Sequence, residues 1–192
     1  MYLSSAAVYG RFGTLPLRED TPLRPVSPYG VHKRIGEDLC RLYGAQFGVP
    51  ALVMRLFSVY GAGMRKQLLW DAGQRVRSGE PSFGGTGKET RDWLHVEDVA
   101  SLIERAHEMA SGKCPVINGG TGIGVSVAQI LGELFSGLGS IGQPQFTGRR
   151  REGDPETLVA DTSRALATGW RPKIAWKDGV RDYAAWFREA AP

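Results

Sequence analysis

The sequence predicts an α/β fold, because two different hydrophobic patterns alternate along the chain. Residues 51–57 form a continuous apolar run of the kind found in buried parallel strands. Residues 28–47 instead space their apolar side chains as one face of a helix does. These side chains belong to Ile35, Leu39, Leu42, Tyr43 and Phe47. Strand and helix patterns that follow each other in this way are typical of α/β proteins.

Length and composition indicate one globular domain. The chain has 192 residues, of which 42% are hydrophobic and 23% charged, enough to bury a sizeable core. The formal charge of +4 is spread along the chain, and only Arg149–Arg151 forms a tight basic cluster. A diffuse charge of this size is weak evidence for nucleic acid, and an anionic small ligand explains a local arginine cluster equally well. We therefore expect no nucleic-acid partner.

Cysteine and histidine usage predicts neither a disulfide nor a metal site. Cys40 and Cys114 are far apart in the sequence, and the three histidines have no close spacing to them. Free thiols and the lack of a signal-peptide pattern predict a cytoplasmic protein. No apolar run approaches the roughly 20 residues that a membrane span needs, so no membrane partner is expected.

The first nine residues are expected to be the end of a buried strand, followed by a proline-rich loop over 10–28. A domain that begins in mid-strand suggests that preceding strands are missing or come from elsewhere. Ser27 suits the N-cap and Pro28 the first turn of the helix at 28–47. Gly36, inside this helix, predicts the close approach of another backbone or a ligand.

Further strands and helices follow. We expect helices at 65–78, 96–106, 125–137, 162–168 and 177–189, and strands near 81–83, 91–95, 115–118, 145–146 and 157–160. Ser58–Gly63 is expected to be a loop at the carboxyl end of the strand at 51–57, where ligands bind in open α/β sheets. The glycine-rich stretches 84–87 and 119–124 are expected to be turns, because neither has the spacing of a phosphate-binding loop.

Tyr29 and Lys33 form the most suggestive local motif. Positions four residues apart lie on the same face of a helix, so both side chains can reach one small ligand. An ammonium held near a phenol favours the phenolate and lowers its pKa, which would suit Tyr29 to act as a general base or acid. An exposed tyrosine and lysine on an amphipathic helix is the alternative, and the motif alone favours that alternative.

Several segments together resemble the NAD-dependent epimerase/dehydratase branch of the extended short-chain dehydrogenase/reductase superfamily, which acts on nucleotide sugars. These segments are Ser4–Gly10, Ser27–Lys33, Arg55–Gly61, Arg91–Asp98, Asn118–Gly120, Arg151–Asp154 and Ala160–Ser163. They follow the family's order and spacing over essentially the whole chain. The resemblance implies a partial Rossmann-like, doubly wound parallel sheet with a small α/β substrate-binding lobe.

The resemblance also implies a division of the chain. Residues 1–192 would be the carboxyl-terminal portion of such an enzyme. Residues 1–64 would be mainly the remaining Rossmann part, and about 65–192 a mixture of its end and the substrate-binding lobe. The helix at 28–47 would form a homodimer, although its apolar face could instead be core. A missing half-sheet would also expose an apolar edge prone to association.

Catalytic and cofactor roles follow from the same resemblance. Ser5 would hydrogen-bond the reacting sugar hydroxyl, and Tyr29 would take or return its proton. Lys33 would hold the ribose hydroxyls of NAD (or NADP) and lower the pKa of Tyr29. Phe57 is implied as a further cofactor contact. The hydride carrier must be a cofactor, because no side chain does that chemistry.

The resemblance implies that the substrate is bound by Ser5, Ser58, Gln67, Leu68, Arg91 and Arg151. The two arginines would grip the diphosphate with forked donors. Arg91 could instead be a surface ion-pair partner of Asp92 or Glu89, and Arg151 part of a solvated basic cluster.

Three departures from the family pattern bear on activity. Ser58 stands where many epimerases carry an asparagine. Ala6 and Ala7 stand where 4,6-dehydratases carry an acidic pair, so dehydration is disfavoured and 4-epimerisation or ketosugar reduction is left. The family's Gly-x-x-Gly-x-x-Gly loop is absent from the 192 residues. We therefore expect this chain alone to bind NAD weakly or not at all and to be inactive.

Three functional hypotheses result. The first is a nucleotide-sugar epimerase of the 4-epimerase type, with a nucleotide-sugar ketoreductase as its near alternative. The second is a non-catalytic remnant that keeps only the nucleotide-sugar pocket. The third is an RNA-binding module at Arg149–Arg151, which is weakest because the cluster has no interleaved aromatic residues.

Overall fold

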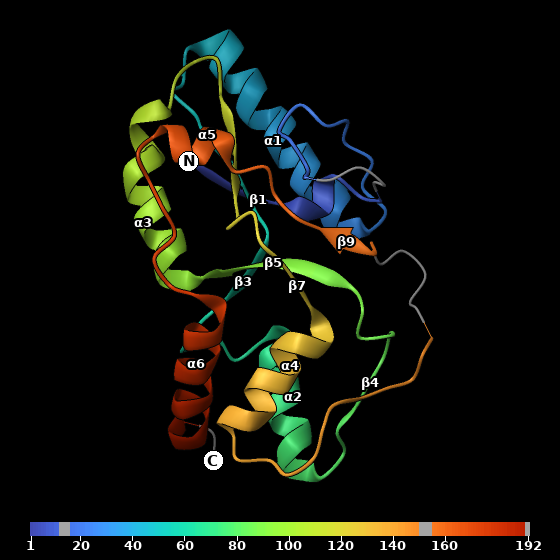
Figure 1. The fold of residues 1–192 in the computed structure, drawn as a ribbon. Coiled ribbons are helices and arrows are strands. Elements are labelled where there is room, and N and C mark those ends of the chain that lie inside the picture. The colour runs from blue at the N-terminus through green and yellow to red at the C-terminus, as the bar shows by residue number, and fades with distance from the viewer. Residues whose placement is uncertain (12–15, 150–154, 191–192) are drawn as a thin grey trace.

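The computed structural model describes residues 1–11, 16–149 and 155–190, and it confirms the α/β fold (Figure 1). The first sheet is parallel, with the order β1 (Tyr2–Ser5), β2 (Val53–Leu56) and β6 (Val116–Gly119). Leu52 and Met54 turn to one face, where they pack with α3 (Val96–Ala106) and α5 (Ser163–Ala167). Helix α1 (Pro28–Phe47) covers the other face. The buried strands and their helices make this half Rossmann-like.

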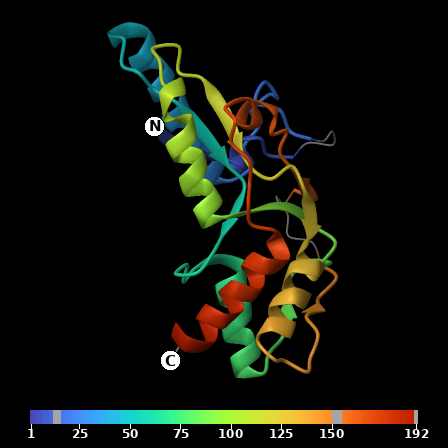
Figure 2. The same cartoon turned by 60° about the vertical axis from the view of Figure 1, so that its left-hand side comes forward.

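The second half of the molecule is a mixed sheet with three helices packed together beside it (Figures 1 and 2). Strand β5 (Thr90–His95) pairs in parallel with β3 (Ser58–Tyr60) and β9 (Thr157–Leu158), and antiparallel with β7 (Gly124–Ser126). The helices are α2 (Gln67–Ser78), α4 (Val127–Gly137) and α6 (Trp176–Ala190). Their core includes Leu134, Phe135, Tyr183 and Phe187. Strand β4 (Ser82–Phe83) pairs with β8 (Gln145–Phe146), and the short helices η1 (Ala6–Val8) and η2 (His107–Met109) complete the elements.

The ends of α1 follow the sequence prediction. The Ser27 side chain accepts a hydrogen bond from the Gly30 amide, and Pro28 occupies the first turn. Gly48 ends the helix with φ 65°, a left-handed conformation that glycine adopts at little cost. The start signals at Ser27 and Pro28 and the predicted range 28–47 of this helix are therefore confirmed.

Two predicted element boundaries are wrong, for local reasons. Ser58–Tyr60 was expected to be a loop but forms β3, because its backbone pairs with Trp93–His95. Val125 was expected to open a helix but lies in β7, paired with Arg91. Helix α4 begins two residues later, where Ser126 and Gln129 form a reciprocal capping box.

The apolar face of α1 does not belong to the core. Ile35, Leu39, Leu42, Tyr43 and Phe47 are 45–67% exposed. The alternative that this face packs inside the chain is therefore wrong. We call these five side chains the outer stripe of α1.

The opposite face of α1 approaches the sheet closely through its glycines. A Cβ on Gly36 would lie 2.2 Å from the Tyr2 hydroxyl, so a side chain approaches the helix there and not the backbone or ligand predicted from the sequence. A Cβ on Gly44 would lie 2.5 Å from the carbonyl oxygen of Gly112. These glycines let α1 lie against β1 and against the turn that precedes β6.

A buried ion pair also joins α1 to the sheet. The Arg55 guanidinium donates two hydrogen bonds to the Glu37 carboxylate, at 2.9 and 2.8 Å, and both side chains are almost fully buried. Ser4, beside Ser5 on β1, donates to Glu37 at 2.6 Å. The Tyr9 hydroxyl accepts from Arg55 and donates to Asn118 on β6. This Glu37–Arg55 network thus connects α1 with all three strands.

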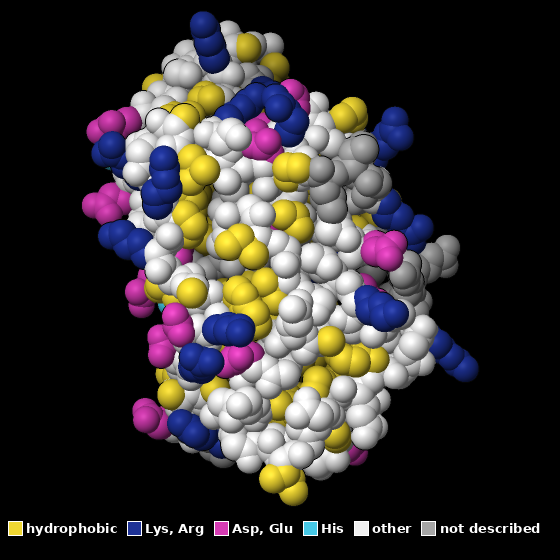
Figure 3. Space-filling view, viewed as in Figure 1, with side chains coloured by type: hydrophobic (Ala, Val, Ile, Leu, Met, Phe, Trp, Pro, Cys, Tyr) yellow, Lys and Arg dark blue, Asp and Glu magenta, His cyan; other side chains and the backbone are white. Residues whose placement is uncertain are grey.

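The surface in Figure 3 carries lysines and arginines interspersed with acidic side chains over the part of this face that is described. Among the described helices, none is both long and apolar enough to cross a bilayer.

Candidate active site

Ser5, Tyr29 and Lys33 are all placed where β1 ends and α1 begins. Ser5 is the last residue of β1, and its hydroxyl accepts a hydrogen bond from the Ala7 amide at 3.2 Å. The first turn of α1 packs tightly on η1, because a Cβ on Gly30 would lie 2.5 Å from the Ala7 carbonyl oxygen. The glycine of the Tyr29-Gly30 pair is therefore needed to bring the tyrosine's turn against the segment that follows Ser5.

Lys33 connects the helix to the strand. Its Nζ donates to the Leu3 carbonyl oxygen at 2.9 Å and lies 5.7 Å from the centre of the Tyr29 ring. The Tyr29 side chain is 56% exposed. The structure thus brings the Lys33 ammonium close to an accessible phenol, and Ser5 ends the strand to which Lys33 is bonded. We call these three residues the Ser5–Tyr29–Lys33 group.

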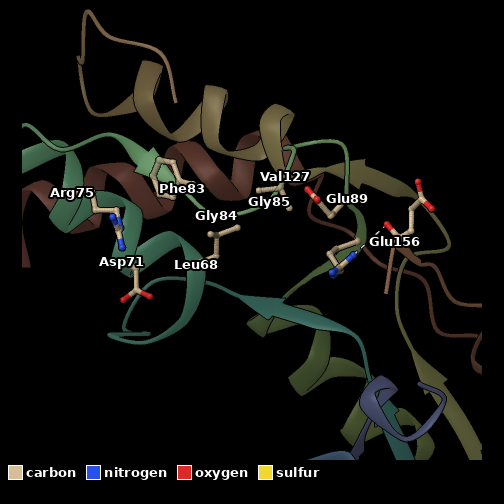
Figure 4. Close-up of a pocket in the computed structure, with 10 residues that line it drawn as sticks. Leu68, Asp71, Arg75, Phe83, Gly84, Gly85, Glu89, Val127 and Glu156 are labelled. Atoms are coloured by element: carbon tan, nitrogen blue, oxygen red, sulfur yellow. Dashed lines mark hydrogen bonds between the residues drawn. The ribbon is translucent and has the colours of Figure 1, made fainter. Parts of the chain in front are cut away.

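A separate pocket of about 320 Å³ lies in the second half of the molecule (Figure 4). It is lined by Leu68, Asp71 and Arg75 of α2, by Phe83, Gly84, Gly85 and Glu89 before β5, and by Arg91, Val127 and Glu156. Arg91 and Leu68, two predicted substrate contacts, are thus brought together. We call this cavity the Arg91 pocket.

Three other predicted substrate or cofactor contacts, Gln67, Ser58 and Phe57, do not line the Arg91 pocket. Gln67 begins α2 in a left-handed conformation, with φ 66°, and its side chain is exposed beside a smaller cavity that also borders Leu68. Ser58 is half-buried at the start of β3. Phe57 is 8% exposed and packs in a cluster with Tyr9 and Leu17. Arg151 lies outside the described residues.

Asp92 is a buried residue whose role sequence reasoning missed. Its carboxylate accepts hydrogen bonds from the backbone amides of Thr121, Gly122 and Ala160 at 2.7–3.2 Å. Burial raises the pKa of Asp92 above its ordinary value, and these hydrogen bonds oppose the shift. Since neighbouring strand residues point to opposite faces, Asp92 points inward and leaves Arg91 on the pocket side. Asp92 therefore holds the strand that presents Arg91.

Several pocket residues also escaped prediction. Arg75 donates to the Ser82 carbonyl oxygen at 2.8 Å, and its guanidinium carbon lies 5.6 Å from the centre of the Phe83 ring. Burial would raise the pKa of Glu89, but hydrogen bonds from Thr86 outweigh it and hold that pKa below its usual range. The sequence signal that could have identified this part of the pocket is Arg75 in the last turn of a helix, followed by Phe83 and two glycines.

One glycine pattern was also overlooked. Gly137, Gly139 and Gly142 have the letters of Gly-x-Gly-x-x-Gly. They follow a helix and not a strand, and Gly139 takes φ 72° just past the end of α4. The stretch is therefore a helix terminus and not a nucleotide-binding turn, which would open a helix after a strand.

The chemistry of the two places is complementary. The Arg91 pocket offers guanidinium groups, carboxylates and an aromatic edge, which suits a polar ligand that carries both an anionic group and hydrogen-bonding atoms. The Ser5–Tyr29–Lys33 group offers two hydroxyl groups and an ammonium. Among the described residues, no cluster of three or more His, Cys, Asp or Glu side chains could hold a metal ion.

Comparison with known proteins identifies the family of this chain. The model of the NAD-dependent epimerase/dehydratase family matches residues 1–120. A putative UDP-glucose 4-epimerase of Methanocaldococcus jannaschii is 32% identical over 96% of this chain, which spans 61% of that relative.

Two solved structures give the same result. A UDP-glucose 4-epimerase of Thermotoga maritima with UDP-glucose matches 99% of this chain and 63% of its own, with 27% identity and a TM-score of 0.89. A UDP-glucuronic acid 4-epimerase variant from Bacillus cereus, in complex with a fluorinated substrate analogue and NAD, matches 97% of this chain and 60% of its own, with 27% identity and a TM-score of 0.87. This chain therefore belongs to the NAD-dependent epimerase/dehydratase family, and it spans about three fifths of the length of these relatives.

Proposed function

We propose that this chain carries the proton-transfer group and the nucleotide pocket of a UDP-sugar 4-epimerase. The observation that carries the proposal is the placement of Ser5, Tyr29 and Lys33 at one end of β1, with Lys33 bonded to that strand. The relatives named above, all called 4-epimerases of UDP-sugars, support this reaction class. Alanines at positions 6 and 7 leave the site without the acid needed for dehydration.

Each residue of the group has one role in the proposed mechanism. Ser5 donates to the reacting sugar hydroxyl and fixes its direction. Tyr29 takes the proton of that hydroxyl and later returns it. Lys33 places its ammonium beside the phenol, with Nζ 5.7 Å from the centre of the Tyr29 ring. The Tyr29 hydroxyl, on an exposed side chain, is open to a substrate at this edge.

The same residues fit the nicotinamide-ribose end of NAD, which when bound supplies the hydride acceptor and donor of the reaction. Lys33 brings a flexible ammonium that can bond ribose hydroxyls, and Tyr29 presents its hydroxyl nearby. Because Phe57 is only 8% exposed, only a small part of its side chain can make the predicted contact with the cofactor. The chain contains no Gly-x-x-Gly-x-x-Gly sequence that could hold the pyrophosphate, so we propose that these 192 residues alone bind NAD weakly and do not turn over.

The Arg91 pocket is proposed to hold the nucleotide. Arg91 would bond the diphosphate, together with Arg151 as the family resemblance implies, while Leu68 and the Phe83 edge border the base and ribose. Gln67 and Ser58 remain proposed contacts from the start of α2 and of β3.

Calorimetric titration of this chain with UDP tests the proposal. We expect saturable binding that weakens by about 10- to 100-fold in Arg91→Ala, because a hydrogen bond to a charged group contributes about 1.5–3 kcal/mol. Lys88→Ala is the matched control, since Lys88 is exposed on the turn before β5 but does not line the pocket. Equal affinity for UDP in the wild type and in Arg91→Ala would contradict the proposal. Micromolar affinity of the same sample for NAD would also contradict it.

The outer stripe of α1 is proposed to form a homodimer. Five large apolar side chains on one exposed helix face are unusual for a monomer, and the face is continuous over three turns. Pairing with the same stripe of a second copy would remove it from water.

A further inference from the structure

The two cysteines of the chain lie on neighbouring elements, although they are far apart in the sequence. Cys40 is on α1, one helical turn from Glu37 and one from Gly44, so the three residues share one face of the helix. Cys114 follows Gly112 in the turn before β6. Both thiols are free, that of Cys40 half-buried and that of Cys114 buried.

Two contacts, one on each side of the cysteines, hold these elements together. At one end, a Cβ on Gly44 would lie 2.5 Å from the Gly112 carbonyl oxygen. At the other end, the Glu37 carboxylate accepts hydrogen bonds from Arg55, which is in register with Asn118 on β6. The helix segment between the two contacts therefore runs alongside the segment that leads into β6, and each segment contains one cysteine.

The electrostatics of the buried thiol agree with this placement. Burial raises the pKa of the Cys114 thiol, and the negative charge of a Cys40 thiolate raises it further. Burial also raises the pKa of the Tyr2 hydroxyl, and Cys40 again adds to the shift. Charges affect each other over about 10 Å at ordinary ionic strength. The Cys40 sulfur therefore lies near the sheet and near Cys114.

We propose that Cys40 and Cys114 form a redox modification site, at which exchange with a low-molecular-weight disulfide of the glutathione type links them to each other. The disulfide would fasten α1 to the segment that leads into β6. Since α1 carries Tyr29 and Lys33, oxidation would also fix the helix of the proposed proton-transfer group. The disulfide itself goes beyond the proposed function and does not depend on it.

The exchange takes two steps. Cys40, the more exposed thiol, loses its proton and its sulfur attacks one sulfur of glutathione disulfide, so that a mixed disulfide forms and one glutathione thiolate leaves. The Cys114 thiolate then attacks the Cys40 sulfur, forms the Cys40–Cys114 bond and releases the second glutathione thiolate. The two glutathione thiolates take up the two protons. Two cysteines are thus oxidised, and one glutathione disulfide is reduced to two thiols.

Folding and disulfide formation should favour each other. A bond between Cys40 and Cys114 closes a long loop in the unfolded chain and so lowers the entropy of the unfolded state. If the folded chain already holds the thiols together, its equilibrium constant for oxidation by glutathione disulfide must exceed that of the unfolded chain. The ratio of the two constants therefore measures how well the fold places the pair.

The experiment equilibrates the 192-residue chain in glutathione buffers of graded composition, with and without urea. N-ethylmaleimide then blocks the remaining thiols, and the intact mass distinguishes reduced chain, mixed disulfide and internal disulfide. Trypsin cleavage should release one linked product, in which the peptide Ile35–Arg41 is joined to Cys114–Arg149.

We expect the folded chain to end as the internal disulfide, with an equilibrium constant about 30-fold or more above that in urea. Oxidised wild type should melt about 5 °C or more above the reduced protein. Cys40→Ala and Cys114→Ala are the matched controls, because each leaves one thiol. Their melting temperatures should not rise by this amount in oxidising buffer. Cys40→Ala alters the half-buried position and serves alone if Cys114→Ala does not fold.

Four results would overturn the proposal. They are thiols that stay free in the folded chain, a mixed disulfide as the final product, disulfides between two chains, and equal constants with and without urea. The wild-type measurement needs no substitution, so it decides the matter even if both variants unfold. Turnover and UDP binding do not enter any readout, so failure here leaves the proposed function untouched.

Discussion

Glu37 is the residue on which the position of the proposed site depends most. It lies one turn after Lys33 on α1 and is bonded to Arg55 on β2 and to Ser4, the neighbour of Ser5. A shift of this carboxylate would therefore move the helix that carries Tyr29 and the strand that carries Ser5 together. The network acts as a fixed connection between the helix and the strand that carry the Ser5–Tyr29–Lys33 group.

Replacing Glu37 by glutamine should destabilise the chain by about 3–5 kcal/mol, because the buried Arg55 charge loses its partner. The measurement is urea unfolding at pH 7. Asp38→Asn is the control: its side chain is 60% exposed, so the loss should stay within about 0.5 kcal/mol. An equal effect of the two substitutions would show that the buried pair adds no stability.

The same pair predicts a pH dependence. Burial would raise the pKa of Glu37, but the hydrogen bonds from Arg55 and Ser4 outweigh it and hold the pKa below the ordinary 4.5. The stability that this carboxylate contributes is therefore complete above pH 4.5 and is lost as the pH falls through the lower folded-state pKa. The stability difference between wild type and Glu37→Gln should shrink in that acidic range. A constant difference would contradict the assignment.

At the residue scale, sequence reasoning singled out residues whose signals are local. Helical spacing pointed to Tyr29 and Lys33, although only the family resemblance favoured a catalytic role for them, and the same resemblance pointed to Arg91 and Leu68. Asp92 could not, because its partners come from residues 121, 122 and 160, and only the folded chain brings these amides to one carboxylate. Arg75 and Phe83 likewise become pocket residues through the packing of α2 beside β4.

At the scale of elements, helix α1 illustrates how glycine sets a packing distance. Gly44→Ala should destabilise the chain by about 1–3 kcal/mol, because the added methyl meets the Gly112 backbone, which cannot move aside as a flexible side chain can. Gly132→Ala in α4 is the matched control. No atom lies within 4 Å of its Cβ, so it should gain up to about 1 kcal/mol from helix propensity.

Thermal or urea unfolding of the two variants checks this prediction. A stabilising Gly44→Ala would mean that α1 does not lie as close to the Gly112 backbone as the structure shows.

Helices were predicted better than strands for a physical reason. Caps and hydrophobic spacing are local signals, so α1 could be placed from Ser27, Pro28 and Gly48. The short strands β3 and β7 exist because they pair with β5, and that pairing joins residues far apart in the sequence. The outer stripe of α1 has the pattern of a core face, and sequence alone does not tell whether such a face meets its own chain or another.

At the scale of the whole molecule, the exposed stripe predicts self-association. Leu39→Lys should shift the chain from dimer to monomer, because each pair of stripes would bury two charges without partners. Ile141→Lys is the control, since Ile141 is a fully exposed apolar residue on a loop far from the stripe in sequence. Sedimentation velocity measures both variants. A wild-type monomer, or a dimer that survives Leu39→Lys, would contradict the proposal.

In the proposed function, Tyr29 is the proton carrier of a UDP-sugar 4-epimerase. The most direct test joins this chain to the part of the Thermotoga maritima enzyme outside its match and measures 4-epimerisation of UDP-glucose in the presence of NAD. Tyr29→Phe should lower turnover by about 10²- to 10⁴-fold and leave UDP binding unchanged, because only a proton-transfer step is lost. Tyr43→Phe, an equal change on the outer stripe of the same helix, should leave turnover intact. No turnover in the unsubstituted protein, or equal turnover with Tyr29→Phe, would contradict the account.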